Sequence, residues 1–418
     1  MKFNQIVLGD YIDVLTDYHA NGAYEKLKAN VTLKHDPDYA IMIRTLNFEA
    51  GNFDSKLIYI NKDEYKFLSK SKVYSNDIIM NKIANAGSVY IMPELNRPVS
   101  LAMNLFLIRF NDLLDKRFMY YLMHLYEPYI KQYANGTATL TITKDSVKGL
   151  KFYVPPLPTQ QKIAKILSNY DDLIENNLKR IKLLEESARL TYEEWFLRFR
   201  VDGKRLEINP ESGLPFGWEN KSVTECDTFK QDKRKVKEFE GEKKYYATAN
   251  ISETEIIADG EIISWDSKPS RAQIKPNNNT VWFARMSNTY KVLCFNKKNI
   301  NLQDNSVLSS GFAGFKAKND LCLPFLYFTI NSTFFHELKD LYATGATQVS
   351  LNNDSMSFIK IIEPSANLAE EFGSRTLPLI EEISILRSKN QLLKEARNIL
   401  LPRLMTNVID TDELDIAV

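Results

Sequence analysis

The chain has 418 residues, 44% of them hydrophobic and 26% charged, which is enough for two or three soluble globular domains with their own cores. Its 54 Lys and Arg nearly balance its 53 Asp and Glu, and the net charge of +1 argues against a histone-like DNA binder while leaving room for local basic faces. No apolar run has membrane-spanning length, no signal-peptide pattern opens the chain, and three cysteines without metal-ligand spacing suit a reducing compartment, so we expect a cytoplasmic protein that contacts no membrane.

Residues 1–154 predict a mixed α/β domain. Short β-like runs separated by turn residues are followed by a helical pattern over residues 116–133, a polar loop containing Gly136, and a last strand over residues 150–154. The predicted early strands are Ala40–Leu46, Leu57–Ile60, Asp77–Ile83 and Ser88–Met92.

A long helix is predicted next, over Pro155–Arg200, with Gly203 as its stop signal. Apolar residues recur there in steps of three and four, the period of a helix with one apolar face. A helix of this length extends roughly 60 Å at 1.5 Å per residue, which is more than a compact domain needs and is typical of a coiled coil. The predicted contact face consists of Ile163, Ile166, Tyr170, Ile174, Ile181, Leu184 and Ala188.

The segment Asn209–Trp218, which contains two prolines and two glycines, is a predicted linker. After it, the sequence again shows the pattern of short strands and helices found in the first domain. The predicted elements are strands at Thr280–Ala284 and Lys291–Phe295, a helical pattern over 323–341, a loop at Thr344–Thr347 and a strand at Phe358–Ile362. A second long helix is predicted over Asn367–Leu401, ended by Pro402. Its apolar face consists of Leu377, Ile380, Ile383, Leu386, Leu393 and Leu400.

This order of elements is an internal repeat. A shift of 209 residues, half of the chain length, places Gly136 on Gly345 and Pro155 on Pro364 without a gap. Further upstream the halves match only in pattern, with insertions. The chain is therefore predicted to contain two copies of one unit, a variable domain followed by a long helix. The predicted boundaries are 1–154, 155–205, 206–363 and 364–418.

Such a duplication favours a pseudo-two-fold molecule, in which antiparallel pairing of the helices would carry two different domains to opposite ends. Asn177 and Asn390 occupy matching places in the two helices. Either they set the register of the helix pair, at some cost in stability, or they are ordinary solvated positions.

No catalytic motif is recognisable. The chain has no phosphate-binding G-x-x-x-x-G-K-[ST] loop, no dinucleotide-binding G-x-G-x-x-G after a strand, and no Asn/Asp-Pro-Pro-aromatic motif of amino-methyltransferases. The four histidines do not pair with cysteines at ligand spacing, so no metal site is predicted. Asp38 followed by Asp54 and Lys56 faintly resembles a nuclease pattern, but this spacing is common by chance.

Basic residues cluster in the variable halves, where a reader of DNA sequence should differ. Lys and Arg can reach phosphates or guanine edges, and Asn can pair with adenine. Each single position is by itself more simply a solvated surface residue, and the clusters carry more weight than their members. The candidates for DNA contact are Lys66, Lys70, Lys72, Asn81, Lys82 and Asn85 in the first domain, and Lys233, Arg234, Lys235, Lys237, Lys268, Arg271, Lys275 and Arg285 in the second. Arg285 lies about where the pattern places Lys82.

The repeat, together with the sequences at the junctions between domains and helices, resembles the specificity subunits of type I restriction-modification systems. The resemblance covers essentially the whole chain and rests on several short pieces together. They are the stretch from Asn135 through Phe152, the helix start Val154-Pro-Pro-Leu-Pro-Thr-Gln-Gln-Lys-Ile-Ala164, the stretch Ala188–Phe196, Leu214-Pro-Phe-Gly-Trp218, and Ala396-Arg-Asn-Ile-Leu-Leu-Pro-Arg-Leu404.

The resemblance implies an α+β fold: two α/β target-recognition domains alternate with two long helices that pair as an antiparallel coiled coil. Each domain would read one half of a split, asymmetric DNA target, and the helices would set the spacer. They would also dock two methyltransferase subunits, which use S-adenosylmethionine to methylate adenine N6. A restriction motor-nuclease subunit that uses ATP and Mg²⁺ would join them, so this chain would need no cofactor and would not be an enzyme. One departure is that Glu363–Ala369 replaces the Pro155–Gln161 motif in the second repeat, so docking there is expected to differ in detail.

Two other functions remain open from the residues alone. A coiled-coil scaffold that presents two protein-binding domains would also have a net charge near zero. A self-sufficient nuclease or methyltransferase is disfavoured by the missing motifs.

Overall fold

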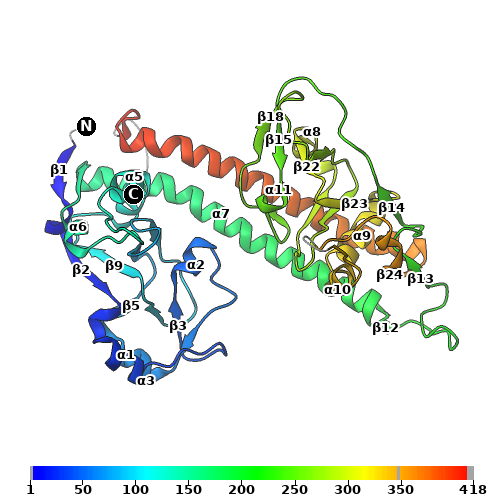
Figure 1. Cartoon of the computed structure of the whole chain (residues 1–418), viewed down its shortest axis with the longest axis horizontal. Coiled ribbons are helices and arrows are strands. Elements are labelled where there is room, and N and C mark those ends of the chain that lie inside the picture. The colour runs from blue at the N-terminus through cyan, green and yellow to red at the C-terminus, as the bar shows by residue number, and fades with distance from the viewer. Residues whose placement is uncertain (1–2, 346–348, 412–418) are drawn as a thin grey trace. The chain divides into compact units, whose positions relative to one another are not determined.

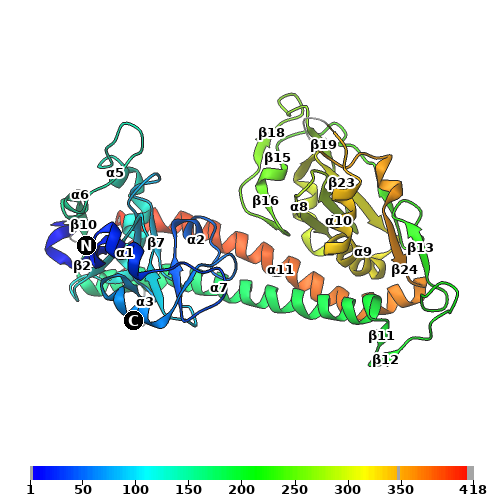
Figure 2. The same ribbon diagram turned by 60° about the horizontal axis from the view of Figure 1, so that its bottom comes forward.

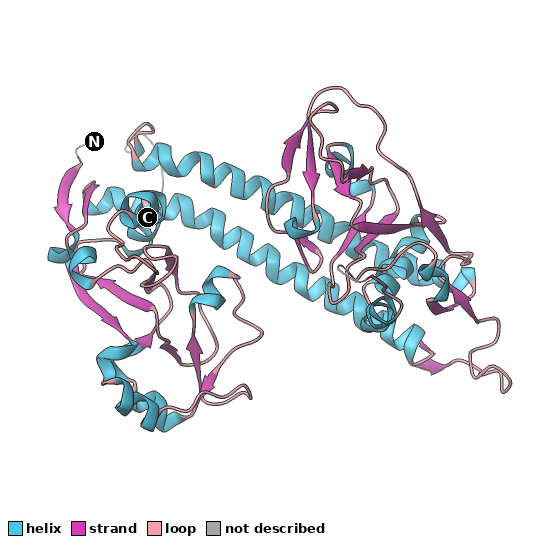
Figure 3. Ribbon diagram, viewed as in Figure 1, coloured by secondary structure: helices cyan, strands magenta, loops and turns pink. Residues whose placement is uncertain are grey.

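The computed structural model of the protein describes residues 3–345 and 349–411. The chain divides into two compact units, one made of residues 1–173 with 393–418, the other of residues 174–392. Each unit holds one mixed α/β domain and a stretch of both long helices (Figure 1). Strands and short helices alternate within both domains (Figure 3), as the residue pattern predicts.

The first domain contains two four-stranded sheets, with strand orders β2-β9-β6-β7 and β4-β3-β8-β5, and a separate antiparallel pair, β1-β10. Strands β3 and β6 are buried along their whole length, as continuous apolar runs in interior strands should be. The strands are β1 Asn4–Val7, β2 Ile12–Asp17, β3 Ala40–Ile43, β4 Tyr59–Ile60, β5 Lys72–Val73, β6 Ile78–Asn81, β7 Val89–Ile91, β8 Val99–Leu101, β9 Leu105–Phe110 and β10 Lys151–Val154. The helices are α1 Tyr24–Asn30, α2 Thr45–Glu49, α3 Lys62–Phe67, α4 Lys116–Leu125, α5 Glu127–Lys131 and α6 Lys144–Lys148, with the short 3-10 turns η1 Leu8–Tyr11, η2 Tyr18–Asn21 and η3 Ser69–Ser71.

The second domain has the sheets β14-β23-β20-β21 and β18-β15-β22-β19 and the antiparallel pair β13-β24. Its strands are β13 Glu219–Ser222, β14 Phe229–Asp232, β15 Lys243–Tyr246, β16 Ile251–Ser252, β17 Glu255–Ile256, β18 Glu261–Ile263, β19 Ala272–Ile274, β20 Thr280–Ala284, β21 Val292–Phe295, β22 Ser306–Ser309, β23 Phe312–Ala317 and β24 Lys360–Glu363. Its helices are α8 Ile300–Asp304, α9 Leu323–Ile330 and α10 Thr333–Leu341, with the 3-10 turns η5 Thr248–Asn250, η6 Lys297–Asn299, η7 Asp320–Cys322 and η8 Ser355–Phe358.

The two domains share one topology. The order β2-β9-β6-β7 corresponds to β14-β23-β20-β21, and β4-β3-β8-β5 corresponds to β18-β15-β22-β19. Each second sheet contains one parallel pair, β3 with β8 and β15 with β22, among antiparallel neighbours. The duplication predicted from the back half of each repeat therefore extends through the front halves, where insertions hide it in the sequence.

The predicted strands are confirmed, most with shorter bounds, but two predicted helices are each divided in two. The pattern over 116–133 forms α4 and α5, because Pro128 begins a new helix within it. The pattern over 323–341 forms α9 and α10, because the Ser332 hydroxyl accepts the Phe335 N–H at 3.1 Å and caps a new helix.

The first long helix, α7, spans Leu157–Tyr192 and continues as a π-helical turn, η4 Glu193–Leu197. The prediction that Gly203 stops it was wrong. The helix ends at Leu197, Phe199 two residues later has a φ of +54°, and Gly203 instead forms the turn of a short hairpin between β11 Arg200–Val201 and β12 Lys204–Arg205. Asp202 and Gly203 both have positive φ, as the tight hairpin turn with an Asp-Gly pair requires.

The second long helix, α11, spans Ala366–Met405. The prediction that Pro402 ends it was wrong, since the helix continues for another turn. A proline inside a helix costs about 3 kcal/mol. Leu401, Leu404 and Met405 are buried in the core of the first unit, and each buried side chain of this kind contributes about 1.5–3 kcal/mol, which offsets that cost.

The two long helices lie side by side in the second unit (Figure 2). Ile181 and Leu184 of α7 pack against Ile383 and Leu386 of α11. Because Asn177 pairs with Asn390 while Ile181 meets Ile383, the helices run antiparallel.

Most of the rest of each predicted contact face packs into a domain core. In the first unit, Ile163 joins the core that holds Leu401 and Leu404, and Ile166 packs at its edge. In the second unit, Leu377 and Ile380 join an aromatic core. Ile174 is buried, whereas Tyr170 and Leu393 are half-buried. The seam of coiled-coil type is therefore short, and the helix ends are anchored to the domains.

None of the described helices is both long enough and apolar enough to cross a membrane.

Candidate nucleic-acid interface

The end of β6 in the first domain is bonded to the glycine loop that follows α5. The Lys82 N–H donates to the Asn104 carbonyl at 2.8 Å, and the Lys82 carbonyl accepts the Ile142 N–H at 3.0 Å. Asn135 and Thr141 close the loop with two backbone hydrogen bonds of 2.8 and 2.9 Å. Lys82 is thus held in a frame made by a strand end and a closed loop.

The second domain repeats this frame around Arg285. Its N–H donates to the Gly311 carbonyl at 2.9 Å, and its carbonyl accepts the Leu351 N–H at 2.9 Å. Thr344 and Ser350 close the corresponding loop with bonds of 3.1 and 3.0 Å. Arg285 therefore occupies the place of Lys82, as the pattern predicted. Residues 346 and 347 of the predicted loop lie outside the described residues.

Gly136 is required by the turn itself. Its φ is +148°, and a Cβ there would lie 2.2 Å from the Thr139 carbonyl oxygen. Its counterpart Gly345 has a φ of +136°. A larger residue at position 136 would clash with its own loop, so turning the chain is reason enough for a glycine there.

The Lys82 side chain lies beside an acidic residue. Its Nζ is 3.0 Å from Asp17 Oδ2, and Lys144 Nζ is 3.4 Å from Asp17 Oδ1. Burial raises the pKa of Asp17, but the hydrogen bond from Lys82 and the charge of Lys144 lower it by more, so the carboxylate stays ionised. Two cations on one buried anion leave a local excess of positive charge. Lys144 was missed by the sequence reasoning, although it directly follows the glycine loop.

The basic run of the first domain lies near the same place. Lys70 is exposed, and its N–H donates to the Asn21 side chain at 2.9 Å, at the end of η2. The turn η2 begins directly after Asp17, so this short segment connects Lys70 with the Lys82 pair. Lys66 is exposed and pairs with Asp63 at 3.1 Å, and Lys72 Nζ lies 4.8 Å from the centre of the Tyr65 ring.

The two candidate asparagines differ in exposure. Asn81 is fully buried, and its Nδ2 lies 3.4 Å from Glu49 Oε1 and 3.3 Å from the Tyr90 hydroxyl. Its amide faces the inside of the domain. Asn85 is exposed on the turn after β6, where its carbonyl accepts the Ser88 N–H. Of the two, Asn85 is placed to meet a ligand at the surface.

The fold brings the two basic runs of the second domain together. Lys235 forms an antiparallel bridge with Ile274 of β19, so the run 233–237 lies beside the run that contains Arg271. Lys233 is exposed. Arg234 is exposed too, but its guanidinium Nε binds the Asp232 carboxylate at 3.0 Å.

Two of the residues predicted to contact DNA already use their side-chain donors in hydrogen bonds within the domain. Lys275 Nζ donates to the Gln303 and Asp304 carbonyls, and burial, together with the neighbouring Lys243, lowers its pKa. The Arg285 guanidinium donates to three acceptors, namely the Phe312 carbonyl at 3.0 Å, the Leu351 carbonyl at 3.1 Å and Asn353 Oδ1 at 2.8 Å. Burial lowers the pKa of Arg285 as well.

Aromatic rings stand next to the basic residues of the second domain. Trp265 and Phe239 meet edge to face at 5.8 Å between centroids. Lys268 Nζ lies 4.8 Å from the Trp265 ring and Lys243 Nζ 5.2 Å from the Phe239 ring. Phe239, Lys243 and Trp265 were missed by the sequence reasoning, and the interleaving of lysines with aromatic residues was the signal that could have found them.

Over residues 3–345 and 349–411, no group of three or more His, Cys, Asp and Glu side chains is placed to hold a metal ion.

Comparison with known proteins finds similarity to the specificity subunits of type I restriction enzymes. Residues 16–186 match the model of the type I restriction modification DNA specificity domain. The specificity subunit of the type I restriction enzyme MjaIX from Methanocaldococcus jannaschii is 25% identical over 327 residues, which cover 71% of this chain and 70% of that protein. The HindI specificity subunit from Haemophilus influenzae is 24% identical over 344 residues, covering 64% of this chain and 71% of that protein.

The fold is similar to a solved structure as well. The crystal structure of the type I restriction-modification S subunit from M. genitalium matches with a TM-score of 0.56 and 14% identity, covering 97% of this chain and 96% of that one. At this level of identity the likeness concerns the fold, and it agrees with the tandem arrangement of mixed domains and long helices.

Proposed function

We propose that this chain, which belongs to the family of type I restriction-modification specificity subunits, reads a split DNA target, with one half-site for each domain. Members of this family recognise DNA and are not catalytic themselves. The observation that carries the proposal is the repeated frame that holds Lys82 in one domain and Arg285 in the other at the same backbone position. Around this shared frame the exposed basic residues differ, as two readers of different half-sites require.

Phosphate contacts supply affinity and base contacts supply selectivity. In the first domain, we assign the DNA face to Lys70, Lys82 and Lys144, which are linked through Asp17 and η2, and to the exposed Asn85 on the turn after β6. Lys66 and Lys72 extend it toward α3.

In the second domain we assign the DNA face to Lys233, Lys235, Lys268 and Arg271. Lys233, Lys235 and Arg271 are exposed, Lys268 is half-buried, and the bridge between Lys235 and Ile274 joins the two runs. Lys275 and Arg285 act mainly by holding the backbone of this face in place, since their donors are occupied within the domain.

The helices make the two contacts cooperate. Once one domain holds its half-site, the second contact becomes intramolecular, so neither domain needs high selectivity by itself. We further propose that two methyltransferase subunits, which would bring S-adenosylmethionine, and restriction subunits, which would use ATP and Mg²⁺, assemble on this chain. The methyltransferase subunit would extrude the adenine from the stack.

The salt dependence of DNA binding tests the proposal. We expect the chain, alone or with a co-expressed methyltransferase subunit, to bind duplex DNA with an affinity that falls steeply with salt. Arg271→Ala should reduce the slope of log affinity against log salt by about 1, because one phosphate contact is lost. Fluorescence anisotropy of a labelled duplex between low and moderate salt measures both quantities.

The matched control is Lys298→Ala. Lys298 is exposed, like Arg271, but lies in η6, next to Lys297, which pairs with Glu381 of α11. This variant should leave the slope unchanged. If the wild-type chain binds no duplex with or without the methyltransferase subunit, the DNA-reading proposal is wrong and a protein-binding scaffold becomes the better reading.

A further inference from the structure

We infer that each unit carries a docking groove for one copy of the methyltransferase subunit, lying between the helix before the glycine loop and the last strand of the domain. The inference rests on the proposed function, which supplies the partner. It moves part of the docking surface from the long helices to the recognition domains themselves.

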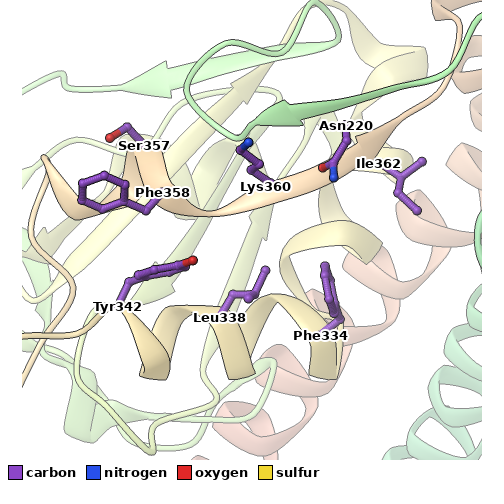
Figure 4. Close-up of a pocket in the computed structure, with 8 residues that line it drawn as sticks. All are labelled: Asn220, Phe334, Leu338, Tyr342, Ser357, Phe358, Lys360 and Ile362. Atoms are coloured by element: carbon purple, nitrogen blue, oxygen red, sulfur yellow. The ribbon is translucent and has the colours of Figure 1, made fainter. Parts of the chain in front are cut away.

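The groove of the second unit lies between α10 and the segment that leads into β24 (Figure 4), with a volume of about 550 Å³. Phe334, Leu338 and Tyr342 line one side, spaced four residues apart along α10. Phe358 and Lys360 line the other side, and the Tyr342 and Phe358 rings are 5.8 Å apart.

This surface is apolar and exposed. Phe334 is 55% exposed and Phe358 is 60% exposed. The neighbouring Phe335 and His336 are buried in the domain, so α10 has apolar residues both on its buried face and on the face that lines the groove. A monomeric soluble protein seldom exposes adjacent aromatic side chains in this way unless another molecule covers them.

The 209-residue shift places similar residues at four of the groove positions in the first unit. Tyr129, Tyr133, Lys151 and Tyr153 stand where Leu338, Tyr342, Lys360 and Ile362 stand in the second unit. Tyr153 is 61% exposed. The Tyr129 hydroxyl lies 3.1 Å from the Tyr133 hydroxyl and accepts the Lys151 N–H at 3.2 Å, so helix and strand face each other here too.

Surface residues that are similar at equivalent positions of the two units are expected to contact the same kind of partner in each. The basic clusters assigned to DNA differ between the units, whereas exposed Lys151 and Lys360 occupy equivalent positions beside aromatic side chains in both. Duplex DNA offers a row of phosphates, for which one lysine among aromatic side chains is a poor match. An apolar ridge of a protein with a carboxylate beside it is complementary to such a groove.

The position of the groove favours the methyltransferase among possible proteins. Tyr133 and Tyr342 come two residues before the loop-closing residues Asn135 and Thr344, and those loops are bonded to the backbone next to Lys82 and Arg285. A protein seated in the groove therefore stands next to the proposed DNA face. An enzyme that modifies a base within the target has to stand there, and two equivalent grooves match two copies of it.

The test counts the copies bound. We expect the wild-type chain to bind two methyltransferase subunits, measured by mass photometry of the co-expressed complex. Phe334→Glu combined with Phe358→Glu should weaken the second copy at least tenfold and leave a complex with one copy. Adding Tyr153→Glu should weaken both. Lys360→Glu, which alters an exposed charge and leaves the apolar residues in place, should weaken one copy several-fold.

Two controls separate the groove from general surface effects. Leu341→Glu changes a residue of α10 that is 70% exposed and does not line the groove, and Tyr24→Glu changes a tyrosine of the first unit that is 60% exposed. Both should keep two copies bound. All variants should keep the wild-type melting temperature within a few degrees, and they should bind duplex DNA as the wild type does.

The outcomes distinguish the groove from the function on which it rests. If the wild type binds neither DNA nor the methyltransferase subunit, the proposed function fails and the inference falls with it. If the wild type binds both, but the triple variant still holds two copies with unchanged affinity, only the groove is refuted. Loss of DNA binding with both copies retained would assign the groove to DNA and likewise refute it, as would an equal loss of binding in the controls.

Discussion

At the scale of single residues, equivalent positions serve different purposes in the two domains. Lys82 and Arg285 share a backbone frame, yet Lys82 pairs with a carboxylate while the Arg285 guanidinium holds three oxygen atoms of its own domain. An identical frame therefore does not imply an identical contact with DNA. Arg285 is more strongly tied to the stability of its domain than Lys82 is.

The clearest pH-sensitive residue of the second domain is His336. It is 3% exposed, and its Nδ1 has no hydrogen-bond partner. Burial and the neighbouring Lys339 lower its pKa from 6.5 to about 4. The folded state thus keeps the imidazole neutral at pH values where the unfolded chain binds a proton. The stability that results is complete above pH 6.5 and is lost as the pH falls toward 4.

We predict that the second domain loses on the order of 2 kcal/mol of stability between pH 7 and pH 5 through this residue. In His336→Gln this part of the loss should vanish, even if the variant is less stable at pH 7, because no titrating group remains at the site. Hydrogen exchange of α10 at the two pH values measures the effect. His35→Gln, an exposed histidine of the first domain, should leave the pH dependence unchanged, and an unaltered pH dependence in His336→Gln would contradict the prediction.

At the scale of elements, the long helices combine two kinds of packing. Their outer parts join the domain cores, and a short middle seam is formed by Ile181, Leu184, Ile383 and Leu386. Next to this seam, Asn177 Nδ2 donates to Asn390 Oδ1 at 2.8 Å, and Asn390 is 5% exposed with no partner for its own Nδ2. Of the two interpretations that the sequence allows, this geometry supports the one in which the asparagines set the register.

We predict that replacing both Asn177 and Asn390 with Leu stabilises the helix pair by about 1–3 kcal/mol, since a buried amide without a full set of partners is removed. The same change should broaden the range of spacer lengths accepted, because apolar side chains pack in more than one register. Melting curves and binding to targets with a spacer one base pair shorter or longer measure the two effects.

Asn176→Leu is the matched control, since Asn176 is an exposed asparagine of the same helix. It should change neither the melting temperature nor the choice of spacer. A double Leu variant that discriminates spacers as sharply as the wild type would show that the asparagines do not set the register.

At the scale of the whole molecule, the duplicated topology fits the proposal that one chain contains two different readers of DNA. The repeated topology keeps the frames, the glycine loops and the helix joints alike, while the surface residues between them have diverged. If the domains act as independent readers, each should be exchangeable without altering the half-site of the other.

We predict that exchanging residues 1–154 for the first recognition domain of another family member changes one half of the methylated target and leaves the other half and the spacer unchanged. Each domain has its own core, so the exchange should preserve the fold of the second unit. Methylome sequencing of a host that carries the complex, before and after the exchange, identifies both halves. A change in both halves would contradict independent reading.

Local patterns in the sequence predicted most of the architecture. The period of the long helices, the positions of several strands and the 209-residue repeat are encoded over short windows, and the structure confirms them. At Pro402, a distant contact overcame the local signal for a helix end. The helix passes through Pro402 because its last turn is buried against the core of the first unit.

Tertiary structure alone decided which candidate residues remain at the surface. Lys82 and Arg285 are 203 residues apart while Ile142 and Leu351 are 209 apart, so insertions hide their equivalence from a simple shift of the sequence. The partners of the candidates are distant as well: Asp17 is 65 residues from Lys82, and Asn353 is 68 residues from Arg285. A sequence shows which residues are charged. Only the packing of remote segments determines whether a charged group is paired within the domain or remains available to a ligand.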